Sequence, residues 1–222
     1  AEQAGIPRTD DFNRGDNHGC GYFHVNQKNG RRYSAARGFL KPILNRPNLV
    51  VQIDVSVEKV LIEQGRAIGV QYRHKNGPVH NIRTENEVIL SAGAINSPHL
   101  LQLSGIGPAE DLSKNGIPVI LDAPGVGANL QDHLQIRPIY KVSGVKTLNT
   151  EYKSLFNRAL MGLEYVLRRT GPLTMAPSQL GAFTRSSPEQ TRPNLQFHIQ
   201  PLSLDKFGDP LRHFIERRLG LV

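Results

Sequence analysis

The pattern of apolar and polar residues changes abruptly between residues 88 and 108. The apolar run at 88–90 is typical of a buried strand, and the small residues that follow allow a sharp turn. Ser97 followed by Pro98 predicts the start of a helix, because a Ser hydroxyl can accept a free amide proton and Pro needs no partner at the first helical position. Gly105 predicts that this helix ends near residue 104.

A strand that turns into a helix through small residues exposes main-chain amide groups and the positive end of the helix. An anionic ligand can approach such a corner closely. The same pattern also fits an ordinary strand-to-helix connection, so the residues alone leave both interpretations open.

Three β-rich runs between residues 49 and 90 predict an antiparallel meander. Turn residues separate the runs at 63–65 and at 76–78. Apolar residues alternate with polar ones along the first run, at Val51, Ile53, Val55 and Val57.

Helices and strands are predicted on both sides of this meander. Short helices are expected at 34–40 and 110–115, and an amphipathic helix is expected from residue 152 to the Gly171-Pro172 pair. Strands are expected at 22–25, 117–121, 134–142, 180–184 and 195–200. The fold class is therefore mixed, α/β or α+β. The pattern of residues along the chain changes near His133.

Composition narrows the class of protein. The 222 residues include 21 Gly and 15 Pro, which indicates many turns, and the single Cys20 excludes an internal disulfide framework. No apolar run is long enough for a transmembrane segment or a signal sequence. We expect a soluble, cytoplasmic protein.

The formal net charge of +8 raises the question of nucleic-acid binding. The basic residues, however, lie in small separate groups, with no zinc-finger spacing and few interleaved aromatic residues. Three pairs of arginines stand out, at 31–32, 168–169 and 217–218. These arginine pairs are better explained as solvated surface charge than as a nucleic-acid-binding site. Such charge can also favour binding of an anionic cofactor.

The sequence lacks the motifs of metal sites, hydrolases and P-loop nucleotide-binding proteins. The eight His residues form no metal-ligand pattern, so no metal site is predicted. Ser104 lies in QLSGIG, which is not a nucleophile elbow, and no P-loop lysine follows a glycine-rich turn. Cys20 has no evident His partner and is expected to be a passive thiol.

The segment GAINSPHLLQLSGIG, residues 93–107, resembles the second signature of the glucose-methanol-choline (GMC) oxidoreductases, flavoproteins that oxidise alcohols with FAD. Other segments resemble that family in the same order: NGRRYSAARGFL, RPNLVV, EVILSAGA, PGVGANLQDH and GPLTMAPSQLGAFTRS. The resemblance covers about residues 10–210 and favours the choline-dehydrogenase-like branch.

The resemblance implies the fold, the domains and the cofactor. It implies part of a Rossmann-like FAD-binding domain with an antiparallel meander, followed by part of a substrate domain with an antiparallel sheet and helices. The expected division is a connecting segment at 1–37, a partial FAD domain at 38–133 and a partial substrate domain at 134–222.

The resemblance also implies residues that contact FAD. The corner Ser91, Ala92, Gly93 and Ala94 is expected beside FAD, and Val57 is expected to meet the adenine through its main chain. The other expected cofactor residues are Ser97, Asn129, Asp132 and His133. For the last two, an ordinary turn-capping Asp and a core His are equally compatible with the sequence.

Two features of the family are absent from these residues. There is no Gly-x-Gly-x-x-Gly turn for the pyrophosphate, since 105–107 and 125–127 both lack the third glycine. There is also no segment with the family's catalytic His and its His or Asn partner. We therefore expect a central segment of such an enzyme, without catalytic residues, that is inactive alone and holds FAD weakly. The charged end at 214–222 suggests a frameshifted or truncated reading frame, and a folded remnant without flavin is the alternative.

One residue bears on the substrate. Gln179 stands where choline-oxidising relatives are expected to carry a glutamate, which suits a neutral alcohol better than a trimethylammonium group. The alternative is that Gln179 is an ordinary polar sheet residue and that this alignment is displaced by one position. The electron acceptor is not predicted, and strands without partners are expected to cause self-association.

Overall fold

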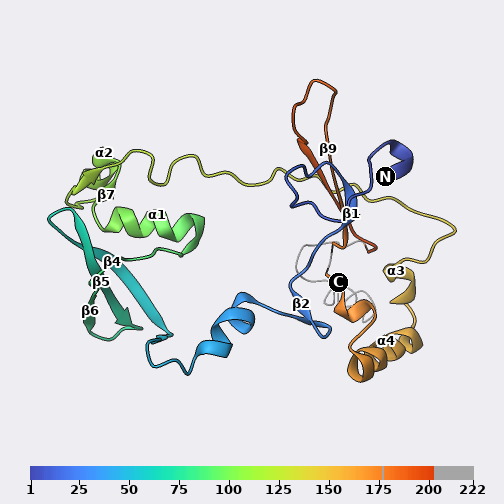
Figure 1. The fold of residues 1–222 in the computed structure, drawn as a ribbon, viewed down its shortest axis with the longest axis horizontal. Coiled ribbons are helices and arrows are strands. Elements are labelled where there is room, and N and C mark those ends of the chain that lie inside the picture. Colours follow the sequence, from blue (N-terminus) through green and yellow to red (C-terminus); the bar gives the residue numbers. More distant parts are fainter. Residues whose placement is uncertain (177, 203–222) are drawn as a thin grey trace, which may run out of the picture. The chain divides into compact units, whose positions relative to one another are not determined.

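The computed structural model describes residues 1–176 and 178–202, so the expectations for 214–222 and the arginines 217–218 lie outside the described residues. The chain forms two compact units. One unit is residues 44–136, and the other combines 1–43 with the described residues after 136 (Figure 1). The expected domain boundaries after residues 37 and 133 stay predictions.

The predicted meander is confirmed in the unit 44–136. Strands β4 (Val55–Glu63), β5 (Arg66–His74) and β6 (Val79–Arg83) pair antiparallel in chain order. Gln64 and Gly65 both have positive φ, the geometry that matches the twist of a two-residue hairpin. The first strand begins later than the alternation predicts, because Asp54 has a φ of 57° and breaks the extended chain.

The helix of the 88–108 segment differs from the prediction. Helix α1 spans Gly93–Leu103, so Pro98 lies inside it and Ser97 is not its cap. The Ser97 hydroxyl instead accepts a hydrogen bond from Ala92 N at 3.0 Å, one residue before the helix. The prediction that Ser97 caps the helix is therefore wrong, and its hydroxyl instead supports the residue that precedes the first turn.

The strand predicted at 88–90 is not formed. A β-strand needs main-chain hydrogen bonds to a neighbouring strand, and no strand of the described chain pairs with these residues. The apolar pattern alone cannot supply that neighbour.

A small layer follows α1. Strands β7 (Ile106–Gly107) and β8 (Leu121–Asp122) pair in parallel, and helix α2 (Ala109–Lys114) connects them with the acidic first turn that the sequence predicts. The predicted strand at 117–121 is thus reduced to two paired residues. The buried side chains of this unit come from β4, α1 and α2: Val60, Leu100, Ser104 and Leu112.

The second unit is built on the sheet β1-β9-β10. Strand β9 (Leu180–Thr184) lies between β1 (Gly19–Tyr22) and β10 (Leu195–Ile199), and both pairings are antiparallel. The two later strands confirm the sequence prediction. The first strand was expected at 22–25 and lies earlier, where a β-carbon at Gly21 would collide with the main chain of Thr9. Glycine there permits close packing.

Short elements connect this sheet to the helices. They are η1 (Glu2–Ala4), the hairpin β2 (Gln27–Lys28) and β3 (Arg31–Arg32), and two helical turns, η2 (Ala36–Leu40) and η3 (Lys41–Ile43), where a helix was predicted at 34–40. The strand predicted at 134–142 is not formed, because no strand of the described residues pairs with this segment.

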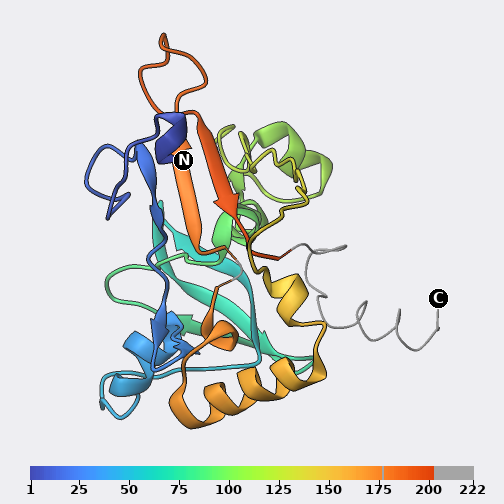
Figure 2. The same cartoon turned by 90° about the vertical axis from the view of Figure 1, so that its right-hand side faces the viewer.

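The predicted amphipathic helix is confirmed but shorter. Helix α3 (Leu148–Glu151) precedes α4 (Leu155–Arg168), which is the gold helix in Figure 2, and η4 (Pro172–Thr174) follows. The hydroxyl of Ser154 caps α4 by accepting from Asn157 N. Arg169, with a φ of 57°, ends the helix before Gly171. None of the helices among the described residues is both long and apolar enough to cross a membrane.

Candidate functional site

The N-terminus of α1 is an exposed corner made of small residues. Gly93 has a φ of 88°, and apart from its chain neighbours and the backbone of its own helix no atom lies within 4 Å of the position that a β-carbon would take there. Ala92 offers no side-chain cap, and the first turn contains no acidic residue. The first amide groups of a helix have no partner within it. This corner can therefore receive an anionic group without moving a side chain.

Strand β4 lies beside α1 and is an edge strand of its sheet. Val57 is 41% exposed on this strand, close to a β-bulge that leaves Glu58 without a cross-strand partner. The Glu58 carboxylate pairs with Arg73 on β5, and this hydrogen bond raises the pKa of Arg73 above its ordinary value. The bulge next to Val57 is thus held by an ion pair.

Ser104 connects α1 to β4. Its hydroxyl accepts a hydrogen bond from Val60 N at 2.8 Å and donates one to Leu100 O. Ser104 is only 5% exposed, so this bond is shielded from water. The bond fixes the strand that carries Val57 relative to the helix that begins at Gly93.

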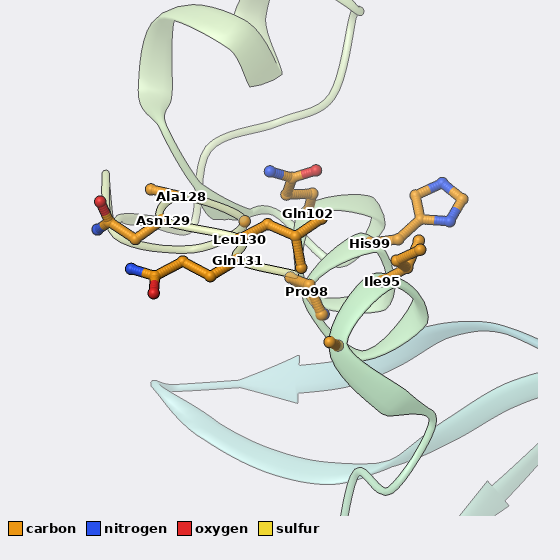
Figure 3. A pocket seen from close by; sticks show the side chains of 10 residues that line it. Ile95, Pro98, His99, Gln102, Ala128, Asn129, Leu130 and Gln131 are labelled. Carbon is orange, nitrogen blue, oxygen red and sulfur yellow. The ribbon is translucent and has the colours of Figure 1, made fainter. Parts of the chain in front are cut away.

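A hollow of about 550 Å³ lies between α1 and the turn that follows β8. Figure 3 shows the side chains of Ile95 and His99 on the helix side and those of Asn129 and Gln131 on the opposite side. Asn129 has a φ of 56°, a left-handed conformation that Asn tolerates better than most residues. The residues that line the hollow are Ala94, Ile95, Pro98, His99, Gln102 and 127–131.

The structure brings some of the predicted cofactor residues together and leaves others apart. Ala94 and Asn129 line the same hollow. Asp132 and His133 are exposed and do not line it, and the Asp132 carboxylate accepts a hydrogen bond from His133 N at 2.7 Å. The chain forms no turn at Asp132, so this bond does not support the turn-capping alternative, and His133 is exposed rather than a core residue.

The residue pattern alone did not indicate that His99 and Gln102 line the hollow. Ile95, Pro98, His99 and Gln102 recur at helical spacing on α1. That signal becomes visible only when the helix begins at Gly93, because the predicted start at Pro98 removes the first turn.

Gln179 lies in the other compact unit. It precedes β9, and its main-chain oxygen accepts a hydrogen bond from Phe23 N at 2.8 Å. Its side chain is half-buried. The neighbouring Phe23 ring covers Gly181 and packs against His198, with ring centroids 5.2 Å apart.

The GMC oxidoreductase profile matches residues 1–135, which include the α1 corner, Val57 and the hollow. The chain belongs to the GMC oxidoreductase family. It is 42% identical over 208 residues to alcohol dehydrogenase [acceptor] of Pseudomonas putida, a match that covers 93% of this chain and 38% of that protein. It is 45% identical over 207 residues to human mitochondrial choline dehydrogenase, covering 93% of this chain and 34% of that protein.

The chain is also similar in structure to solved FAD-dependent oxidoreductases. An FAD-dependent oxidoreductase from Chaetomium thermophilum superposes with a TM-score of 0.70 at 28% identity, over 82% of this chain and 33% of that chain. The present chain thus spans about a third of the length of the relatives that it matches.

Proposed function

We propose that this chain is part of an FAD-dependent oxidoreductase that oxidises an alcohol by hydride transfer to the flavin. The observation that carries the proposal is the open corner at Gly93, which lies inside the segment that matches the GMC family. The names of the two relatives, an alcohol dehydrogenase and a choline dehydrogenase, support an alcohol as substrate.

The residues of this corner fit the adenine-nucleotide half of FAD. The diphosphate is anionic, and the first turn of α1 offers main-chain amides without a competing carboxylate. Ser91, Ala92, Gly93 and Ala94 would hold this half of the cofactor, with Ser97 supporting the turn through Ala92 N. When bound, FAD supplies the acceptor for the hydride.

Val57 would hold the adenine through its main chain. Main-chain groups of alternate residues on an edge strand face away from the neighbouring strand, and Val60 N does so when it bonds Ser104. A bulge between Val57 and Lys59 shifts this alternation by one residue. We therefore expect the main chain of Val57 to face the same open edge as that of Val60.

Asn129, Asp132 and His133 would lie toward the flavin in this proposal. We assign no catalytic residue to the chain, because its sequence contains no match to the family segment that removes the hydroxyl proton. It also has no Gly-x-Gly-x-x-Gly turn. The 222 residues alone should therefore bind FAD weakly and be inactive.

ADP binding by the purified chain tests the proposal. Ala94→Glu places a carboxylate in the first turn of α1. The helix dipole stabilises this carboxylate, so the helix should stay folded, but its negative charge repels the diphosphate of ADP. We expect the dissociation constant for ADP, measured by calorimetry, to rise at least tenfold. Ser113→Glu adds the same charge on the exposed side of α2 and should leave ADP binding unchanged.

Three other experimental results would each contradict a different part of this proposal. Equal ADP affinity for wild type and Ala94→Glu would refute the nucleotide site at α1. A folded chain that binds neither ADP nor FAD would favour the remnant without flavin. Alcohol-dependent dye reduction by the isolated chain would contradict its expected inactivity.

The substrate proposal concerns Gln179, which we place near the substrate. A neutral amide there compensates a quaternary ammonium group less well than a carboxylate. In a chimera in which this chain replaces the matching part of the Pseudomonas putida relative, Gln179→Glu should raise kcat/KM for choline relative to a neutral primary alcohol. We expect a tenfold rise, about 1.4 kcal/mol of transition-state discrimination. A wild-type chimera that prefers choline tenfold would contradict this proposal.

The electron acceptor stays unassigned, and the cellular location remains a prediction. One relative is named for an unspecified acceptor and others as oxygen-dependent choline dehydrogenases. The expected cytoplasmic location contrasts with the human relative, whose name places that protein in mitochondria.

A further inference from the structure

The Gln102 side chain lies between Gly107 on β7 and Gly127 in the turn after β8, two glycines that are distant in sequence. A β-carbon at Gly107 would lie 2.9 Å from Gln102 Cγ, and one at Gly127 would lie 3.0 Å from Gln102 Nε2. Both distances are shorter than ordinary carbon contacts. Glycine at 107 and 127 therefore makes the space that Gln102 occupies.

Gln102 is also bonded to the turn that contains Gly127. Its Nε2 donates a hydrogen bond to Val126 O at 3.2 Å. The turn itself is closed by two main-chain bonds, Val126 N to Ala123 O and Ala128 N to Gly125 O. Gln102 thus connects α1 to the turn whose next residues form one wall of the hollow.

We propose that Gln102 is a positioning residue that holds the turn at residues 125–131 against α1 and so sets the shape of the hollow. The glycines at 107 and 127, which lack the spacing of a pyrophosphate cradle, serve instead as the seat for its side chain. The consequence for cofactor binding rests on the proposed function, but the positioning role does not.

Amide hydrogen exchange of the full chain tests this role. Gln102→Leu keeps most of the side-chain volume and removes the donor, whereas Gln102→Glu keeps the shape and turns an acceptor toward Val126 O. In both variants we expect the amides of Val126 and Ala128 to exchange at least tenfold faster, with the amide of Val60 unchanged. The matched control is Gln71→Leu, which removes an exposed amide bond to Asn81 on the meander.

Two results would overturn the role. One is unchanged exchange at Val126 and Ala128 in Gln102→Leu. The other is an equal rise throughout residues 44–136, which would show that Gln102 contributes only to general stability.

A double-mutant cycle tests the seat independently. Gly107→Ala should raise the unfolding equilibrium constant in the wild-type background, because its β-carbon meets Gln102 Cγ. In the Gln102→Ala background, which lacks that Cγ atom, the effect of Gly107→Ala should be at least fivefold smaller. Equal effects in the two backgrounds would refute the seat.

ADP affinity separates this inference from the proposed function. If Gln102→Leu loosens the turn and weakens ADP binding, both are supported. If the turn loosens and ADP affinity stays constant, the positioning role is upheld, and the turn at residues 125–131 does not contribute to the proposed nucleotide site.

Discussion

At the scale of single residues, a few buried polar contacts determine how the candidate site is assembled. Ser104 is the clearest case, because its hydroxyl joins β4 to α1 in a buried environment. A buried amide left without an acceptor costs more than an average hydrogen bond contributes.

Ser104→Ala should therefore lower the free energy of unfolding by about 1–3 kcal/mol, since Val60 N loses its acceptor. Urea denaturation measures the change. Ser113→Ala, on the exposed side of α2, is the control and should stay within about 0.5 kcal/mol of wild type. Equal effects of the two substitutions would contradict the role of Ser104.

Asp11 gives the chain a defined response to acid. A hydrogen bond from Asn13 N is the largest cause that lowers the pKa of Asp11 below its ordinary value of 3.8, partial burial opposes it, and His24 and Arg14 add smaller contributions. Because the folded pKa is the lower one, the stabilisation is present above pH 3.8 and is lost as the pH falls through the folded value.

An NMR titration of the Asp11 carboxyl carbon should give a midpoint below 3.8 in the folded chain. The loss of stability between about pH 5 and pH 2 should also be smaller in Asp11→Asn, which cannot titrate. A midpoint at or above 3.8 would show that the hydrogen bond from Asn13 does not hold in solution.

At the scale of elements, helix ends depend on local bonds that the sequence partly reveals. Helix α4 was recognised from its apolar spacing, but its ends follow from Ser154 at the start and the left-handed Arg169 at the finish. The strand expected at 88–90 does not form. A strand depends on a neighbouring strand, whereas a helix end depends on its own residues.

Ser154→Ala should lower the free energy of unfolding by about 1 kcal/mol, because Asn157 N loses its side-chain acceptor. Ser154→Asn should retain most of the stability, since Asn is also a strong capping residue. Chemical denaturation followed by circular dichroism measures both variants. A loss of equal size in both would mean that capping is not the cause.

At the scale of the whole molecule, each unit leaves strand edges open. Among the described strands, β10 and β6 each have one neighbour. Strand β10 also carries Leu195, Phe197 and Ile199, each more than 40% exposed. Open apolar edges pair readily with other chains.

We predict that the isolated chain self-associates through such edges. Light scattering at about 20–50 μM should give a mass at least twice that of one chain, and Phe197→Lys should reduce it because a charge on an edge strand opposes pairing. His80→Lys, on the open edge of β6, tests whether that strand contributes. A single-chain mass for the wild type would contradict the prediction.

The sequence by itself determined the family, the meander and the helices α2 and α4. These follow from local signals, since alternation, capping residues and turn glycines act over a few residues. It also placed the small corner at residues 91–94. The true start of α1 could not be predicted, because Ser97 accepts a hydrogen bond from Ala92 N instead of capping the helix, and because Pro98 is tolerated inside it.

Tertiary structure alone decided which distant residues meet. The Gln102 side chain lies against Gly107 and Gly127, and the main chain of Gly21 lies against that of Thr9, because such contacts depend on the path of the chain between the residues. The strands expected at 88–90 and 134–142 do not form, because the path of the chain brings no neighbouring strand of the described residues to them. A strand is stabilised by hydrogen bonds to a partner, and no pattern within the strand encodes whether that partner is present.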